Sequence, residues 1–229
     1  MKIHKDLIQG SPEWLRARLG KPSASHGSKI VNSYTEPQYY ADNKVNEKNG
    51  IAGKLKNKAG WGDGAITYAL DLLIEVLLDT PTFVPVNFAM EHGLEYEPYA
   101  REIYEANKNV VVEQVGGIED KGVWYSPDGL VGKDGLIEIK CPQPQAHLRF
   151  MIGKGDIDSK YIGQMQFGMM VSGRKWCDFI SFHPDFPDHL KIKVVRVERD
   201  EEYQKLLKSR LEEFIVLQGK LNTKVKLNK

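Results

Sequence analysis

Residues 122–142 have the sequence GVWYSPDGLVGKDGLIEIKCP, which has the pattern of two strands joined by a tight turn. Both 122–131 and 135–140 are rich in β-branched, aromatic and aliphatic side chains, as strands usually are. The segment Gly132-Lys133-Asp134-Gly135 between them supplies the glycines that hairpin turns favour. Pro142 ends the second strand, because proline has no N–H to donate to a sheet. The stretch therefore predicts an antiparallel β-hairpin.

Charged residues on this hairpin are spaced so that they share one face. Side chains alternate along a strand, so Glu138 and Lys140 point to one side while Ile137 and Ile139 point into a packed layer. Asp128 lies across the hairpin, where antiparallel pairing can bring it near Glu138. Two converging carboxylates suit a hard divalent cation, Mg²⁺ or Mn²⁺. Such an ion activates a bound water, and Lys140 is suited to orient that water and stabilise negative charge on a phosphodiester.

The same three residues have a simpler interpretation. Glu138 and Lys140 can form an ion pair on a half-exposed strand, and a Glu-x-Lys pattern alone is weak evidence of catalysis. The surrounding pattern favours the functional interpretation. Ser126-Pro127-Asp128-Gly129 follows an aromatic strand, and Ile137-Glu138-Ile139-Lys140-Cys141-Pro142 follows an apolar hairpin.

Helical and strand patterns alternate along the rest of the chain. No internal repeat interrupts them, so we expect one domain over residues 1–229. The order predicts a mixed α/β fold with a central sheet covered by helices. We expect helices at 13–19, near Ser25, at 65–78 (mostly buried), 86–107, 159–171 and 200–221, and further strands at 110–118, 176–183 and 190–198.

Composition places the chain among ordinary globular proteins, with 41% hydrophobic and 28% charged residues. The net charge of +1 does not by itself indicate a nucleic-acid partner. Basic residues gather at 1–30 and 219–229 and acids at 91–138, which suits cation-binding carboxylates flanked by surfaces for a polyanion, although solvated charged faces give similar counts. We expect 41–63 to be a mobile basic loop that contacts DNA or is simply solvated, and 222–229 to be a basic tail.

Several classes of site lack their sequence signatures. Cys141 and Cys177 are too few for a disulfide framework or an iron–sulfur site, and the six histidines show no H-x-H or H-E-x-x-H spacing, so a zinc hydrolase is not expected. No glycine-rich loop is followed by lysine and Ser/Thr, so we expect no nucleotide cofactor. The longest apolar run is too short and too charged to span a membrane, so we expect a cytoplasmic protein.

Six motifs together resemble the phage lambda exonuclease or YqaJ-like viral recombinase family, within the PD-(D/E)xK nuclease superfamily. They occur in the family's order between residues 14 and 171, and as a set they are specific. They are WLRARLG (14–20), SAS (23–25), GLEYE (93–97), SPDGL (126–130), EIKCP (138–142) and YIGQMQ (161–166). The resemblance implies a restriction-endonuclease-like core. The 41–63 segment is longer and richer in lysine than its equivalent in the family.

The resemblance also assigns roles to residues. It implies that Asp128, Glu138 and the backbone carbonyl of Ile139 bind Mg²⁺, with Glu95 supporting a second ion. Lys140 and Gln164 would handle the attacking water. Arg18, Ser25 and Ser126 would bind a 5′ phosphate, in a pocket shaped by Trp14. Each of the helix residues has a simpler alternative, since Glu95 can be a solvated acid, Gln164 a local hydrogen-bond partner and Trp14 part of the core.

The family further implies the biology of the protein. A ring-shaped homotrimer would digest the ends of double-stranded DNA from 5′ to 3′ in a bacterial cell, leaving 3′ overhangs for a single-strand annealing partner. Two other functions remain open. One is a site-specific endonuclease or junction resolvase, because the same core makes many kinds of DNA cut. The other is a non-catalytic DNA-binding recombination scaffold, which the presence of both carboxylates and the lysine disfavours.

Overall fold

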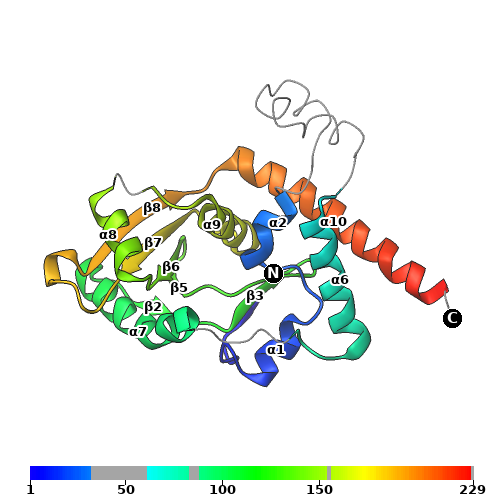
Figure 1. Ribbon diagram of the computed structural model, residues 1–229, viewed down its shortest axis with the longest axis horizontal. Helices are drawn as coiled ribbons and strands as arrows, with labels where there is room; N and C mark the ends of the chain where they lie inside the picture. Colours follow the sequence, from blue (N-terminus) through cyan, green and yellow to red (C-terminus); the bar gives the residue numbers. More distant parts are fainter. Residues whose placement is uncertain (32–60, 83–87, 154–155, 228–229) are drawn as a thin grey trace.

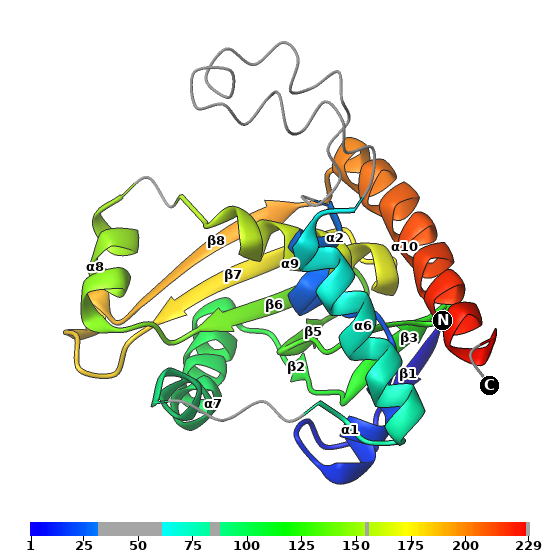
Figure 2. The same ribbon diagram turned by 45° about the vertical axis from the view of Figure 1, so that its right-hand side comes forward.

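A five-stranded mixed sheet forms the centre of the protein (Figures 1 and 2). The computed structural model describes residues 1–31, 61–82, 88–153 and 156–227. In the central sheet β6 and β7 are parallel, and the other neighbours are antiparallel. Its order is β2 (Val112–Glu113), β5 (Gly129–Val131), β6 (Gly135–Lys140), β7 (Trp176–Phe182) and β8 (Ile192–Glu198). A smaller sheet has the order β1 (Lys2–His4), β3 (Gly117–Asp120) and β4 (Val123–Tyr125).

Helices cover both faces of the central sheet, as the predicted mixed α/β fold requires. Leu136 of β6 packs in one core with α9 (Ser159–Ser172). Ile137 and Ile139 face the other way, into a second core with α7 (Phe88–Lys108). This alternation confirms that the two isoleucines point into a packed layer, and it directs Glu138 and Lys140 toward the α9 face. Figure 2 shows α9 and α7 on opposite sides of the sheet.

The predicted strands at 110–118 and 122–131 are each broken in two. In each case one half joins the small sheet and the other half joins the central sheet. The first break falls at Gly116, where an added Cβ would lie 2.4 Å from the Leu7 carbonyl oxygen, so only glycine allows this crossing of the backbone. The second falls at Ser126-Pro127-Asp128, where proline cannot continue the ladder. Asp128 therefore lies between strands rather than within one.

Three helices depart from the sequence prediction. The helix α8 (Pro144–Ile152) was not predicted, although Pro144 at its first turn is a typical helix start. The helix α6 (Asp63–Leu78) was predicted to be mostly buried, but an apolar stripe on it is exposed. The terminal helix α10 (Glu201–Leu227) runs through most of the predicted basic tail, because the segment 221–227 (LNTKVKL) contains neither glycine nor proline to end it.

Shorter elements complete the N-terminal region. They are α1 (Pro12–Arg18), the 3₁₀ turn η1 (Ala24–His26) and α2 (Gly27–Val31). Ser11 caps α1 by accepting a hydrogen bond from the Trp14 N–H, as its position before Pro12 predicts. Most of the expected 41–63 loop lies outside the described residues. No helix among the described residues is both long enough and apolar enough to cross a membrane.

Candidate active site

The three residues predicted to form the chemical centre lie together where β4, β5 and β6 meet. Gly129 pairs with Ile137 across the hairpin, so Asp128, one residue earlier, comes opposite Glu138. The Asp128 Oδ2 atom accepts a hydrogen bond from the Ile139 N–H at 2.6 Å. The Lys140 Nζ atom lies 2.5 Å from Glu138 Oε1. Backbone pairing thus fixes two carboxylates and one ammonium group around a single point.

Glu138 is a buried carboxylate that is only half satisfied. Its side chain is fully buried, and its Oε1 atom accepts hydrogen bonds from Lys140 and from Gln164 Nε2, the latter at 2.7 Å. Its Oε2 atom has no hydrogen-bond partner within the described part of the chain. Leaving a charged oxygen buried without a partner is costly, and a bound cation would remove that cost. Gln164 of α9 therefore contacts the centre rather than pairing only within its own helix.

Burial and like charge shift the pKa values at this centre. Burial raises the pKa of Glu138 to about 7, and the neighbouring Asp128 and Glu97 carboxylates add to the rise. Burial also raises the pKa of Asp128. Burial alone would lower the pKa of Lys140, but the Glu138 and Asp128 carboxylates outweigh it and raise that pKa. Lys140 is therefore a permanent cation at neutral pH, beside acids that need another positive charge to ionise.

The donor set fits a hard divalent cation. Asp128 and Glu138 supply carboxylate oxygens, and the Ile139 carbonyl lies on the same strand between Glu138 and Lys140. No three His, Cys, Asp or Glu side chains within the described ranges already converge as a complete ligand set. A metal here would thus rely on two carboxylates, a backbone oxygen and water, which is the pattern Mg²⁺ prefers.

A glutamate of α7 faces the centre, but it is Glu97 rather than the predicted Glu95. Glu95 is exposed and interacts with its neighbour Tyr96. Burial raises the pKa of Glu97 to about 7, with the Asp128 carboxylate as the next cause. Residues two apart on a helix point about 200° apart, so only one of the two glutamates can face the sheet.

The sequence interpretation missed both Glu97 and Arg101. They form an ion pair four residues apart on α7, and the buried Arg101 also donates from Nε to the Asp128 carbonyl at 3.3 Å. Arg101 therefore holds Glu97 and the Asp128 backbone in fixed relation. The i, i+4 spacing of a glutamate and an arginine on a predicted helix was the available signal.

Trp14 and Ser126, predicted to help bind a 5′ phosphate, contact each other. The Ser126 hydroxyl accepts hydrogen bonds from the indole N–H groups of Trp124 at 2.8 Å and Trp14 at 3.1 Å. It lies 3.2 Å from the Gly116 carbonyl, to which it donates its own proton. The Arg18 guanidinium stacks over the Trp14 ring at 4.7 Å. Ser126 thus anchors the platform on which Arg18 lies.

Ser25 lies on η1 next to His26, in a region that the positive charges of Lys29 and Arg18 influence. Its exposed hydroxyl is 3.2 Å from His26 Nδ1 and 3.3 Å from the Ser23 hydroxyl. Burial lowers the pKa of His26 to about 4, and the positive charges of Lys29 and Arg18 lower it further. Arg18 is therefore close enough to link the Ser126 platform electrostatically with the Ser25 turn, although no hydrogen bond joins the two serines in the described structure.

Comparisons with known proteins agree with this architecture. An alkaline exonuclease (LHK-Exo) from Laribacter hongkongensis is 31% identical to this chain, with a TM-score of 0.77, covering 95% of this chain and 97% of its own. A second structure of that enzyme, in complex with dAMP, matches equally well. A phage-related exonuclease from Haemophilus somnus 129PT is 16% identical, with a TM-score of 0.67 over 90% of this chain and 96% of its own, and shares the fold. No curated protein matches the sequence.

The similarity to LHK-Exo extends over almost the whole of both chains and confirms the restriction-endonuclease-like fold that the family resemblance implied. A family model, that of the YqaJ-like viral recombinase domain, matches residues 13–175, which include Asp128, Glu138, Lys140 and Gln164. The chain belongs to the YqaJ-like viral recombinase domain family.

Proposed function

We propose that this protein is a Mg²⁺-dependent exonuclease that hydrolyses linear double-stranded DNA from 5′ to 3′, with Mn²⁺ able to replace Mg²⁺. The observation that supports it most directly is the fully buried Glu138 carboxylate, with one oxygen unpartnered beside Asp128 and Lys140. A buried acid of this kind needs a cation, and the family context makes a phosphodiester the natural substrate.

Each residue of the centre has a distinct part in this reaction. Asp128, Glu138 and the Ile139 carbonyl would hold the ion, which when bound acidifies a water molecule and neutralises charge on the phosphate. Lys140 presents a permanent ammonium group that orients the attacking water and stabilises the negative charge developing on the phosphate oxygens. Gln164 holds Glu138 Oε1 through its amide, which fixes the direction of the free Oε2. Hydrolysis breaks the P–O bond to the leaving 3′ oxygen.

The 5′ to 3′ direction is supported by the cationic cluster at Arg18. A terminal phosphate carries one more ionisable oxygen than an internal one, and a guanidinium can bind it through paired hydrogen bonds. Arg18 presents its guanidinium against the Trp14 ring near Ser126, two residues from Asp128. A 5′ phosphate held there would leave the next phosphodiester for the metal centre.

Membership of the family supports a proposal about the wider biology. We propose a ring-shaped homotrimer that acts in the cytoplasm of a bacterial cell and leaves 3′ single-stranded overhangs for a single-strand annealing protein. The apolar stripe exposed on α6 supports self-association.

One experiment separates this function from the two alternatives. End-labelled linear duplex and covalently closed circular duplex are incubated with Mg²⁺, with Mn²⁺ and with EDTA. We expect loss of the linear substrate with both metals, none with EDTA, and no cutting of the closed circle. Cutting of the circle would support an endonuclease or resolvase, and binding of DNA without any cutting would support a scaffold. Glu138→Gln is the inactive control, and Lys175→Gln, on a lysine at the opposite end of β7, is the matched surface control.

A further inference from the structure

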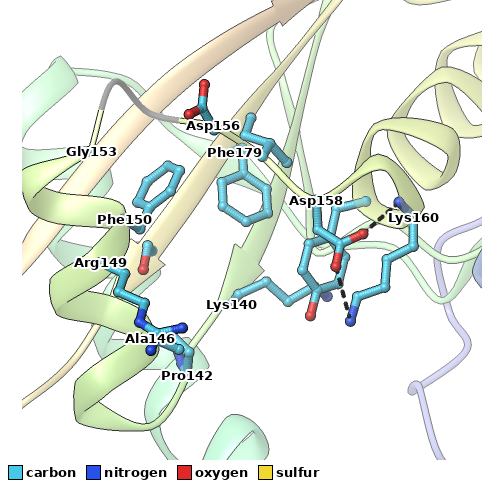
Figure 3. Close-up of a pocket in the computed structure, with 13 residues that line it drawn as sticks. Lys140, Pro142, Ala146, Arg149, Phe150, Gly153, Asp156, Asp158, Lys160 and Phe179 are labelled. Carbon is cyan, nitrogen blue, oxygen red and sulfur yellow. Dashed lines mark hydrogen bonds and ion pairs between the residues drawn. The ribbon is translucent and has the colours of Figure 1, made fainter.

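A cavity opens beside the candidate active site, between α8 and α9. Its volume is about 450 Å³, within the range of pockets that bind small ligands. Lys140 lines it, so the cavity and the proposed metal centre share a wall. Figure 3 shows the Lys140 side chain among the residues that line the cavity, with the rings of Phe179 and Phe150 above it. Lys140, Pro142 and Tyr161 of its lining belong to the family motifs, whereas Arg149, Phe150 and Phe179 lie outside them.

Aromatic rings form one wall of the cavity. Phe179 of β7 is almost fully buried, and the rings of Phe150 and Tyr161 lie 5.4 and 5.6 Å from it, centroid to centroid. Phe150 and Tyr161 are only half-buried, so each has surface available to a ligand. Lys140 Nζ lies 5.2 Å from the Tyr161 ring. This wall therefore begins at the active-site lysine and continues outward as a surface on which a flat ring can stack.

Charges at the rim are divided between two sides. The exposed side chain of Arg149, on α8, has no hydrogen bond or ion pair within the described part of the chain. On the α9 side, Asp158 caps the helix through the Lys160 N–H at 2.9 Å, and its other oxygen lies 3.6 Å from Lys160 Nζ, as the dashed lines in Figure 3 mark. Asp156 also lines the cavity. A phosphate would be attracted to Arg149 and repelled by the two aspartates, whereas the amino and ring N–H groups of a base can donate to them.

The cavity and the Arg18 cluster flank the metal centre. Both ribbon views place α8 on one side of the end of β6 and α1 on the other (Figures 1 and 2). A DNA strand whose 5′ phosphate lies at Arg18 would pass Asp128 and Glu138 and reach the cavity with its next nucleotide.

We propose that this cavity binds the nucleotide on the 3′ side of the scissile phosphate, with its base stacked on Phe150 and Tyr161 and its own 3′ phosphate at Arg149. The inference rests on the proposed function, because it assumes that the strand crosses the metal centre. Stacking on aromatic rings tolerates any base, as an exonuclease without sequence preference requires. Occupation of the cavity unpairs this nucleotide from the complementary strand. It also places the scissile phosphate, on the 5′ side of the nucleotide, in line with Lys140.

The test is a double-mutant cycle in which the DNA carries one of the two changes. Binding of 5′-phosphorylated duplexes is measured by fluorescence anisotropy in EDTA, with an intact strand or with one abasic residue at nucleotide 1, 2 or 3 from the 5′ end. The proteins are wild type and Phe150→Leu, which keeps an apolar side chain but removes the ring. The cycle cancels the cost of unpairing, because both proteins meet the same DNA.

The expected coupling is specific to one position. Removing the base at nucleotide 2 should weaken binding to wild type about 10-fold more than it weakens binding to Phe150→Leu. Removing the base at nucleotide 1 or 3 should weaken binding to both proteins equally. Arg149→Gln should weaken binding of every duplex a few-fold, and Lys175→Gln should leave it unchanged. If Phe150→Leu melts at a much lower temperature than wild type, Tyr161→Leu replaces it in the same cycle.

Other outcomes overturn the proposal in recognisable ways. No coupling at nucleotide 2, or equal coupling at all three positions, would show that the base of nucleotide 2 does not bind in the cavity. Because the titration needs no cleavage, coupling at nucleotide 2 in a protein that fails to digest linear duplex with Mg²⁺ would refute the proposed function and leave the binding site standing. Digestion without coupling would do the reverse, and absence of DNA binding would overturn both.

Discussion

At the scale of single residues, Glu138 combines the demands of folding and of function. The other residues of β6 from Gly135 to Ile139 are buried, so the strand is held in place by apolar packing while it carries a carboxylate into the interior. Lys140 and Gln164 satisfy one oxygen, and the other is left for a ligand. The metal-free protein should therefore be under electrostatic strain at this residue, and that strain can be measured.

The first prediction concerns the pH dependence of stability. Burial raises the pKa of Glu138 in the folded protein to about 7, whereas its ordinary value is 4.5. Between these values the unfolded chain releases its proton and the folded protein keeps it, so the contribution of Glu138 to stability is fully present below pH 4.5 and falls as pH rises to about 7. In EDTA at pH 8, Glu138→Gln should be more stable than wild type, by on the order of 3 kcal/mol, and the difference should vanish near pH 4.5.

Urea unfolding at several pH values in EDTA measures this difference, and a titration with Mg²⁺ supplies the control. Mg²⁺ should stabilise wild type at pH 8 and have little effect on Glu138→Gln, because the variant lacks a carboxylate ligand. A Glu138→Gln variant less stable than wild type at pH 8 would show that the Lys140 ion pair outweighs the cost of burial.

A second prediction uses Glu95 and Glu97 as a matched pair on one helix. Glu97 couples electrostatically to Asp128, and Glu95 is exposed beside Tyr96. Glu97→Gln should lower kcat for DNA digestion at least 10-fold and weaken Mn²⁺ binding measured by calorimetry, whereas Glu95→Gln should change neither. If Glu95→Gln lowered kcat and weakened Mn²⁺ binding while Glu97→Gln changed neither, Glu95 would be the residue that supports the second ion.

A third prediction tests Arg18 as the group that recognises the 5′ end. Wild type should digest 5′-phosphorylated duplex faster than 5′-hydroxyl duplex, because only the former offers the dianionic terminal phosphate. Arg18→Ala should lose most of this preference while keeping Mn²⁺ affinity. Arg16→Ala is the matched control, since Arg16 lies on the same helix but pairs with Asp79. Equal preference in Arg18→Ala and wild type would leave Arg18 as a residue that only packs on Trp14.

At the scale of elements, the position of α9 decides whether Gln164 reaches Glu138. Gly168 of α9 lies against the buried Tyr125, and an added Cβ would come within 2.4 Å of the tyrosine ring. The absence of a side chain at this position lets the helix approach β4 closely enough to place Gln164 at 2.7 Å from Glu138.

The fourth prediction follows from that close approach. Gly168→Ala should destabilise the protein by about 1–3 kcal/mol through overpacking, and it should lower the cleavage rate because Gln164 is displaced. Gly219→Ala is the matched control on α10, where an added Cβ meets nothing within 4 Å, and it should be neutral or slightly stabilising in a helix. Thermal unfolding and initial rates on linear duplex measure both effects. Unchanged stability in Gly168→Ala would mean that Tyr125 can move aside.

At the scale of the whole molecule, one surface is more apolar than a monomer would need. Ile66, Leu70, Ile74 and Leu77 follow the i, i+4 and i+3 spacing of a single stripe along α6, and each is at least 37% exposed. No described part of the chain covers this stripe. Contiguous exposed apolar surface is typical of an interface, so it supports the proposed homotrimer.

The fifth prediction is that this stripe forms the interface between copies of the chain. Sedimentation velocity should give a trimer for wild type, and replacement of Leu70 and Leu77 by aspartate should give a monomer, because two charges would be buried in the interface. Leu148→Asp on α8 is the matched control, since Leu148 and Leu70 are both 41% exposed. A monomeric wild type, or a double variant that remains trimeric, would contradict the prediction.

Local patterns in the sequence were sufficient to predict that Asp128, Glu138 and Lys140 lie together. The alternation of side chains on residues 135–140 put Glu138 and Lys140 on one face, and the hairpin turn brought Asp128 opposite them. Both inferences depend only on residues within about a dozen positions of each other, where backbone geometry is nearly fixed by the type of element.

Tertiary structure alone decided the features that depend on contacts between distant segments. Sequence periodicity places Glu95 and Glu97 on different sides of α7 but does not say which side meets the sheet, because the packing against β6 sets the rotation of the helix. For the same reason the exposed stripe of α6 looked like a buried face, and the strands at 110–131 looked continuous although they divide between two sheets. The cavity between α8 and α9 exists only because β7 brings Phe179 alongside Glu138, from 41 positions further along the chain, by the parallel pairing of two strands.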